Sequence, residues 1–302
     1  MSKRVVVTGT GSITPVGNDT KETWGSIKNG KLGISKISSF STENLPISIA
    51  AEVKGFDAES SLSKKESRRL DRFSQFAVVA AQEALDQAGI DIENEDATRF
   101  SSIVGSGVGG IMTLSDQFKV LHEDGPDKIS PFLIPMMLPD MAAGNVSMKF
   151  GARGINFSPV SACATGTDAI GQAYDLIIKG DIDMAIAGGS EAAICPIALA
   201  GFASVRALSS ISDPEQACRP FDKNRDGFIL GEGSGVLFIE SLEHANARNA
   251  NILAEITGYG ASSDAHHITQ PSPGGEGAAR AMNIALRNSG TNPESIDYIN
   301  AH

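Results

Sequence analysis

The sequence predicts an α/β protein, in which helices cover buried β-sheets. Short runs of β-branched and other apolar residues alternate with amphipathic helical stripes from the start of the chain. Most of these apolar runs open into glycine-rich turns. The order of elements near residue 80 is also weakly repeated near residue 278. Alternation of buried strands with helices is typical of α/β layer architectures.

The first elements can be assigned in order along the chain. Residues 4–8 form a β-branched run closed by a Gly-Thr-Gly-Ser turn, which predicts a buried strand. Residues 73–88 carry apolar side chains at helical spacing, and Gly89 marks the end of this helix. Residues 100–104 predict the next strand, which opens into the turn GSGVGG at 105–110.

The middle of the chain continues the same alternation. Residues 155–160 predict a strand that leads into a segment of small residues, SACATGT at 161–167. A helix follows, because apolar residues recur at i, i+3, i+4, i+7 and i+8 from Ile170, and Gly180 ends the stripe. Three further strands are predicted, at residues 184–187, 236–240 and 252–259.

The internal echo predicts two similar halves. Residues 80–104 read as a helix, a glycine, an acidic linker and a strand, and residues 278–302 repeat this order. The first strand, which ends in Gly-x-Gly, is likewise echoed at 254–260. We therefore expect a second half that begins near Ile252 and contains only its early elements.

Composition excludes several classes of protein. The 302 residues include 25 Lys and Arg against 36 Asp and Glu, a net charge of −11, which argues against non-specific binding to nucleic acid or membranes. The longest uncharged apolar stretch, 192–205, contains Pro196 and is shorter than the roughly 20 residues of a membrane helix. The N-terminal apolar run is too short for a signal peptide.

The cysteine count indicates a reducing compartment. Three cysteines without a C-x-x-C pair fit a cytoplasmic protein, and we expect at least two of them to be small buried apolar residues. They are Cys163, Cys195 and Cys218.

Three motifs suggest ligands but fail on inspection. The turn at 105–110 fits the dinucleotide pattern G-x-G-x-x-G, yet no strand-terminal acid follows in the next βα unit, so a tight turn is the better interpretation. Residues 222–227 open like a calcium loop, but its twelfth position is Gly233 rather than a bidentate Glu. The adjacent pair His266 and His267 has no suitably spaced third ligand. We expect neither a metal nor a cofactor.

Cys163 is the strongest candidate for chemistry. It lies between a predicted strand and the first turn of an amphipathic helix, among Ser, Ala, Thr and Gly only. A helix N-terminus stabilises a thiolate, and small neighbours leave room for substrate and for backbone N–H groups that face an oxyanion. The pattern is similar to a nucleophile elbow. The alternative is a cysteine packed at a strand-to-helix crossover.

Several motifs together resemble the β-ketoacyl-[acyl-carrier-protein] synthases, the condensing enzymes of fatty acid synthesis. They are SACATGT around Cys163, PFDKNRDGFILGEG at 220–233, the final Asn-Ala-His at 300–302, and VVVTGTG at 5–11 followed by Pro-Val-Gly at 15–17. The sequence looks most similar to the type II enzymes. The type I enzymes and the ketosynthases of polyketide synthesis are near relatives and stay open as alternatives.

The resemblance implies a thiolase-like fold of five αβαβα layers whose second half is incomplete here. Residues 1–251 would form the N-terminal half with insertions, and residues 252–302 would begin the C-terminal half. Cys163 would take an acyl chain from a carrier-protein thioester and provide one N–H of the oxyanion hole. The remaining implied site residues are His302, the first of two catalytic histidines, and the acyl-pocket positions Val108 and Phe202.

The resemblance also implies partners. Acyl-carrier protein is acidic, so an acidic enzyme needs a local basic patch to bind it. The segment 63–69 supplies four cations against one acid, and on a helix Lys65, Arg68 and Arg69 would share a face. By family analogy these residues and Arg206 would contact the carrier, the alternative being an ordinary solvated helix face. A homodimer is expected as well.

The family pattern continues beyond the last residue of this sequence. It includes a Lys, a second catalytic His in a Gly-His-x-x-Gly-Ala setting and a gating Phe, none of which is found here. We therefore expect the 302-residue chain to fail in decarboxylative condensation, although Cys163 could still be acylated. Two alternatives from other classes remain: a cysteine hydrolase that uses Cys163 with a histidine, and a non-catalytic scaffold.

Overall fold

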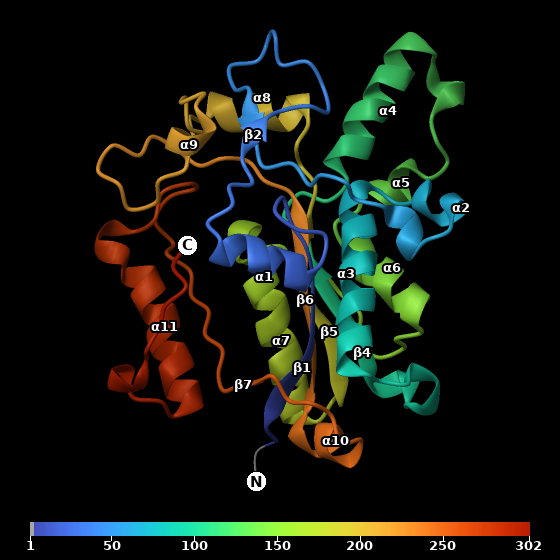
Figure 1. Ribbon diagram of the computed structural model, residues 1–302, viewed down its shortest axis with the longest axis vertical. Coiled ribbons are helices and arrows are strands. Elements are labelled where there is room, and N and C mark those ends of the chain that lie inside the picture. The colour runs from blue at the N-terminus through green and yellow to red at the C-terminus, as the bar shows by residue number, and fades with distance from the viewer. Residues whose placement is uncertain (1–2) are drawn as a thin grey trace.

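The computed structural model describes residues 3–302 and is built on one mixed sheet with strand order β4-β5-β6-β1-β7. Figure 1 shows helices α3 (Arg72–Ala88) and α7 (Thr165–Lys179) on opposite sides of these strands. The strands are β1 (Val5–Ile13), β4 (Phe100–Gly105), β5 (Met184–Glu191), β6 (Gly233–Ser241) and β7 (Ala254–Ile256). This αβα sandwich confirms the predicted α/β class.

The two faces of the sheet follow from alternation along each strand. In β5, Met184 and Ile186 join the buried cluster under α3 and α6 (Met141–Phe150). Ala185 and Ala187 point to the opposite face and pack with α7. Successive side chains of a strand face opposite sides of the sheet, so a continuous apolar run buries both faces.

Strand direction places the carboxyl ends of β1, β4 and β5 at one edge. Strand β4 is parallel to β5, while β6 is antiparallel to both β5 and β1. Gly105, at the end of β4, is in register with Gly189 of β5. The turns after these strands therefore meet at the edge where α7 begins.

Shorter elements surround this sandwich, and β2 and β3 form a separate two-stranded ladder. No helix among residues 3–302 is long and apolar enough to cross a membrane. The remaining strands and helices are β2 (Ser35–Lys36), β3 (Ile49–Ala50), α1 (Thr20–Lys28), α2 (Lys64–Ser67), α4 (Ile111–Glu123), α5 (Leu133–Met137), α8 (Pro196–Ser204), α9 (Pro214–Ala217), α10 (Leu242–Ala247) and α11 (Glu276–Ser289).

Helix boundaries agree closely with the sequence signals. The Asp71 side chain accepts a hydrogen bond from the Phe73 N–H at the start of α3. Gly89 and Gly180 end α3 and α7 in the left-handed region, at φ values of 61° and 81°. Glycine adopts this conformation without the steric cost that a Cβ brings, which explains why both predicted helices stop where they do.

Three strand predictions need correction. Residues 155–160 form no strand. Only Asn156 bridges to Ser102 of β4, and Pro159 has no N–H to donate to a ladder. The predicted strand at 252–259 shortens to β7. Near the end of the chain, Tyr298 and Ile299 are 79% and 62% exposed and pair with no strand among the described residues.

Two further expectations fail. Residues 63–69 do not form one continuous helix, because α2 ends at Ser67 and Arg68 is its C-cap. Of the three cysteines only Cys195 is buried, whereas Cys163 and Cys218 are exposed, so the expectation of two buried cysteines is wrong.

Replacing Gly11 with alanine is expected to destabilise the fold. A Cβ at Gly11 of β1 would lie 1.8 Å from the Ala80 carbonyl oxygen of α3, and backbone cannot move aside as a flexible side chain can. We expect a loss of about 3 kcal/mol in the free energy of unfolding, measured by urea denaturation. The control is Gly25→Ala in α1, where nothing lies within 4 Å of the new Cβ. That variant should gain about 0.5–1 kcal/mol, and equal effects of the two would contradict the packing argument.

Candidate active site

Cys163 lies on a sharp turn that connects the segment beside β4 to α7. It is the middle residue of a short 3₁₀ turn, Ala162–Ala164, and its side chain is exposed. Ala162 is in the left-handed region with φ of 52°, which is unusual for a residue with a Cβ. The Ser161 N–H donates to the Thr165 Oγ1 over 2.9 Å and so closes the turn. The sharp turn and the helix after it fit the nucleophile-elbow interpretation, but residues 155–160 before the turn form only the bridge at Asn156 and not the strand that such an elbow requires.

The start of α7 supplies hydrogen-bond donors next to this cysteine. No side chain caps the N-terminus of α7 in the described structure. The Thr165 N–H donates to the Ala162 carbonyl of the preceding turn, and the helix dipole adds partial positive charge at this end of α7. This environment favours negative charge on an oxygen bound beside Cys163.

The turn at 105–110 lies against the cysteine turn. A Cβ at Gly107 would be 3.5 Å from the Ala162 carbonyl oxygen, and one at Gly105 would be 2.1 Å from the Thr165 Cγ2. The N–H groups of Gly107 and Val108 both donate to the carboxylate of Glu191. The donors that would bind a dinucleotide phosphate are thus occupied by the protein's own acid, which supports the tight-turn interpretation.

Phe202 and Ile111, three residues after Val108, pack against the same apolar cluster. Val108 is 39% exposed on the turn, and Ile111, three residues later, packs against a buried cluster around Leu199. Phe202 of α8 packs against that same cluster, with its ring edge-to-face on Phe228 at 5.5 Å between centroids. The structure therefore brings the segments of both predicted pocket positions together.

His302 and the four predicted carrier-binding cations lie on the surface. His302 is exposed, and within residues 3–302 it makes no hydrogen bond or ion pair to Cys163. All four cations are exposed, and none forms an ion pair among the described residues. Figure 1 shows α2 and α8 apart, with α4 between them in this view. The four cations are Lys65, Arg68, Arg69 and Arg206. The guanidinium of Arg69 lies 4.7 Å from the centroid of the Phe132 ring.

Sequence reasoning missed Asp168, a carboxylate beside the cysteine turn. Asp168 of α7 accepts hydrogen bonds from the Ser161 hydroxyl and, over 2.6 Å, from the Tyr259 hydroxyl. Burial and the neighbouring Asp168 raise the pKa of the Tyr259 hydroxyl, which keeps it a donor. This network connects the turn before Cys163 to the segment after β7. Its only sequence signal was an acid in the first turn of a helix.

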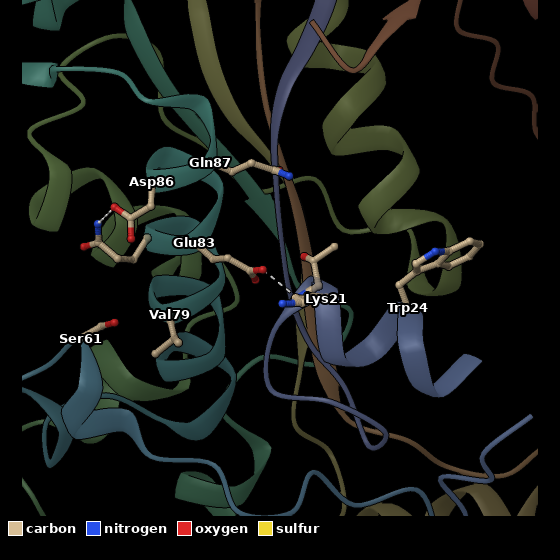
Figure 2. Close-up of a pocket in the computed structure, with 9 residues that line it drawn as sticks. Lys21, Trp24, Ser61, Val79, Glu83, Asp86 and Gln87 are labelled. Atoms are coloured by element: carbon tan, nitrogen blue, oxygen red, sulfur yellow. Dashed lines mark hydrogen bonds between the residues drawn. The ribbon is translucent and has the colours of Figure 1, made fainter. Parts of the chain in front are cut away.

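Two cavities were found away from Cys163. The larger, of 530 Å³, is lined by residues of α1 and α3, and Figure 2 shows Glu83 and Gln87 of α3 extending toward α1, while Asp86 points to the other side of α3. Glu83 is already bonded to the Thr20 N–H at 2.7 Å. The second, of 390 Å³, includes Arg72 and Glu232, which form an ion pair at 2.9 Å. Neither lining contains a cysteine.

Among residues 3–302 no group of three His, Cys, Asp or Glu side chains is placed to hold a metal ion. In the calcium-like segment, Asp226 accepts from the Ser209 hydroxyl at 2.6 Å and the Ser210 N–H at 2.9 Å. These hydrogen bonds lower the pKa of Asp226 to about 2. That acid supports a loop of the protein.

Comparison with protein families gives two adjacent matches. Residues 2–245 match the model described as "Beta-ketoacyl synthase, N-terminal domain", and residues 253–302 match "Beta-ketoacyl synthase, C-terminal domain". A curated relative, 3-oxoacyl-[acyl-carrier-protein] synthase 2 of Staphylococcus aureus strain N315, is 50% identical over 301 residues. The alignment covers 100% of this chain and 73% of the relative.

Solved structures give the same fold. A β-ketoacyl synthase from Burkholderia phymatum STM815 superposes with a TM-score of 0.90 at 35% identity, over 99% of this chain and 74% of that one. A type II polyketide ketosynthase, solved with its acyl-carrier protein and bound to a hexaketide, has a TM-score of 0.86 at 32% identity. That alignment covers 100% of this chain and 74% of the other.

Proposed function

This chain belongs to the β-ketoacyl synthase family, and from that premise we propose that it serves fatty acid elongation as a 3-oxoacyl-[acyl-carrier-protein] synthase. The observation that carries the proposal is the exposed Cys163 on its strained turn at the uncapped start of α7. A thiol held in this way is suited to take an acyl group from another thioester.

The reaction proceeds in two transfers. The Cys163 sulfur attacks the acyl thioester carbonyl, a new carbon–sulfur bond forms, and the carrier leaves as its free thiol. The backbone N–H of Cys163 stabilises the oxyanion that develops in this step. A malonyl group on a second carrier then loses carbon dioxide, and the resulting carbanion attacks the acyl group on Cys163. The product is a 3-oxoacyl carrier, and the cysteine is released.

His302 has its role in the second transfer. Loss of carbon dioxide leaves enolate-like charge on the thioester oxygen of the malonyl group, and a hydrogen bond from an imidazole stabilises that charge. The exposed side chain of His302 is free to meet a substrate. Val108 and Phe202 would line the space for the acyl chain; in support, Phe202 and Ile111, three residues after Val108, pack against one apolar cluster.

The higher identity favours a fatty acid enzyme over a polyketide enzyme. The chain is 50% identical to the Staphylococcus aureus fatty acid enzyme and 32% identical to the polyketide ketosynthase. A cytoplasmic homodimer belongs to the same proposal. The three free cysteines fit a reducing compartment, and a second copy would cover Ile155 and Val160, which are exposed beside the edge strand β4.

The decisive experiment is acylation of this chain by an acyl-carrier protein. We expect intact-mass spectrometry and peptide mapping to find one acyl group, attached to Cys163. Release of free fatty acid without accumulation of the adduct would favour a hydrolase. An unmodified Cys163 would favour a scaffold. Addition of radiolabelled malonyl carrier then tests the expectation from the sequence that this chain does not carry out the condensation step, and normal turnover would contradict that expectation.

Carrier binding should depend on the exposed cations near α2. Arg68→Glu places a negative charge where we propose that an acidic carrier docks, so KM for acyl carrier should rise about tenfold. Added salt should reduce this difference, because exposed charges are screened. The control is Lys179→Glu, an exposed cation at the far end of α7. An equal KM in both variants would contradict docking at α2.

A further inference from the structure

The carboxylate of Glu191 fills the turn at 105–110 from the end of β5. Its Oε1 accepts a hydrogen bond from the Ser106 hydroxyl at 2.9 Å. Its Oε2 accepts from the Gly107 N–H at 2.9 Å and from the Val108 N–H at 3.1 Å. Three donors from consecutive residues thus converge on one side chain that lies more than 80 positions away in sequence. A tight turn gains a fixed shape when its donors share one acceptor group.

The opposite side of this turn is equally constrained. The Gly109 N–H donates to the Ser106 Oγ at 2.9 Å, and the Gly110 N–H donates to the Met137 carbonyl at 3.1 Å. A Cβ at Gly110 would lie 2.2 Å from the Met136 carbonyl oxygen. The turn is therefore held between Glu191 and the segment at 136–137, and its position depends on both.

The same turn touches the segment that carries the nucleophile. Gly105 packs so closely against Thr165 that no side chain would fit between them. Gly107 lies against Ala162, the neighbour of Cys163, with room for little more than a Cβ. Val108 is the next residue and is partly exposed. Loss of the Glu191 contacts would release the N–H groups of Gly107 and Val108, while Gly110 would stay bonded to Met137, so Val108 would be free to move relative to Cys163.

We propose that Glu191 is a positioning residue that sets the location of Val108 relative to Cys163 and thereby the acyl chain lengths that the enzyme transfers. This inference rests on the proposed function. Glu191 does not touch the reacting atoms; it acts through the hydrogen bonds to Gly107 and Val108. The role requires a side chain that reaches the turn and accepts its hydrogen bonds. A shorter side chain should therefore change the chain-length preference, whereas an equally long one that still accepts should retain it.

The test compares acylation of Cys163 by a short-chain and a long-chain acyl carrier in the full chain. In Glu191→Ala we expect the ratio of the two kcat/KM values to change about tenfold, the scale of discrimination by a pocket dimension. Glu191→Gln should restore the ratio, because its oxygen can accept from Gly107 and Val108 while its amide donates to the Ser106 Oγ.

The chain offers a matched control in Glu52. This carboxylate also accepts from one serine hydroxyl and two backbone N–H groups, those of Ser38 at 2.9 and 2.8 Å and of Ser39 at 3.1 Å. Glu52→Ala should lower stability to a similar degree and leave the chain-length ratio unchanged. A wild-type ratio in Glu191→Ala, or an equal change in Glu52→Ala, would overturn the proposal.

A milder variant covers the case in which Glu191→Ala does not fold. Ser106→Ala removes one of the three donors, so an intermediate change in the ratio supports the role of Glu191 and an unchanged ratio refutes it. Failure of the proposed function can be distinguished from failure of this inference. If the wild-type chain is acylated by neither carrier, the proposed function itself fails, whatever the variants do.

Discussion

Replacing Cys163 with alanine should abolish transfer of an acyl group from carrier protein to this chain. Alanine keeps the small volume that the turn accepts, so the fold should be retained while the only proposed nucleophile is lost. Removal of a nucleophile costs at least about 10³-fold in rate for enzymes that form covalent intermediates. Intact-mass spectrometry after incubation with acyl carrier measures the adduct directly.

Cys218→Ala is the matched control for this experiment. Cys218 is the second exposed cysteine of the described chain, so it reports whether exposure alone leads to acylation. We expect Cys218→Ala to be acylated at the wild-type rate. Acylation of Cys163→Ala, or loss of acylation in Cys218→Ala, would remove the basis for the assignment of Cys163. Thermal unfolding of both variants checks that the fold is intact.

The sequence predicted the parts of this site that depend on local signals. A turn of small residues before an amphipathic helix was enough to single out Cys163, because the cysteine, the turn and the helix start are adjacent in sequence. The ends of α3 and α7 were equally local, since Gly89 and Gly180 mark them. The sequence was also sufficient to reject two ligand motifs, because the dinucleotide pattern lacks a strand-terminal acid and the calcium-like loop lacks a Glu at its twelfth position.

The parts that were missed depend on contacts between distant segments. Glu191 acts on a turn far away in sequence, and Asp168 meets Tyr259 only because β7 brings the later segment beside α7. The failed strand at 155–160 has the same origin. Its apolar pattern was suitable, but pairing depends on hydrogen-bond partners along β4, and Pro159 removes one donor.

The folded state should depend strongly on a buried ionic cluster at the other end of the sheet. Glu240 of β6 is fully buried and accepts hydrogen bonds from the Thr8 hydroxyl and from Arg248, at 2.5 Å to its Nη2. Its second oxygen lies 2.5 Å from the His244 Nδ1, and the other ring nitrogen of His244 lies 3.0 Å from Glu95. The cluster joins β1, β6, α10 and the loop before β4.

Glu240→Gln should therefore lower the free energy of unfolding by about 3–5 kcal/mol, because it removes the charge that compensates the guanidinium of Arg248, whose side chain is only 15% exposed. Urea denaturation near neutral pH measures the loss. The control is Glu255→Gln, whose partner Arg4 forms an exposed pair at 2.6 Å and whose loss should cost no more than about 1 kcal/mol. Similar losses in the two variants would show that burial does not set the strength of this cluster.

The pH dependence gives an independent test of the same cluster. Burial opposes ionisation of Glu240, but hydrogen bonds from His244, Arg248 and Thr8 outweigh it and lower the pKa from 4.5 to about 2. The stabilisation from Glu240 is thus present above pH 4.5 and is lost as the pH falls through about 2.

The imidazole of His244 shifts in the opposite direction. Its hydrogen bond to Glu240 is the main reason that the pKa of His244 is raised above 6.5, so its stabilisation is complete below pH 6.5 and is lost as the pH rises through the raised value. Because Glu240→Gln removes this cause, the stability difference between wild type and variant should be larger near about pH 6 than near about pH 8. A difference that stays constant over this interval would mean that His244 is not held as an imidazolium by Glu240.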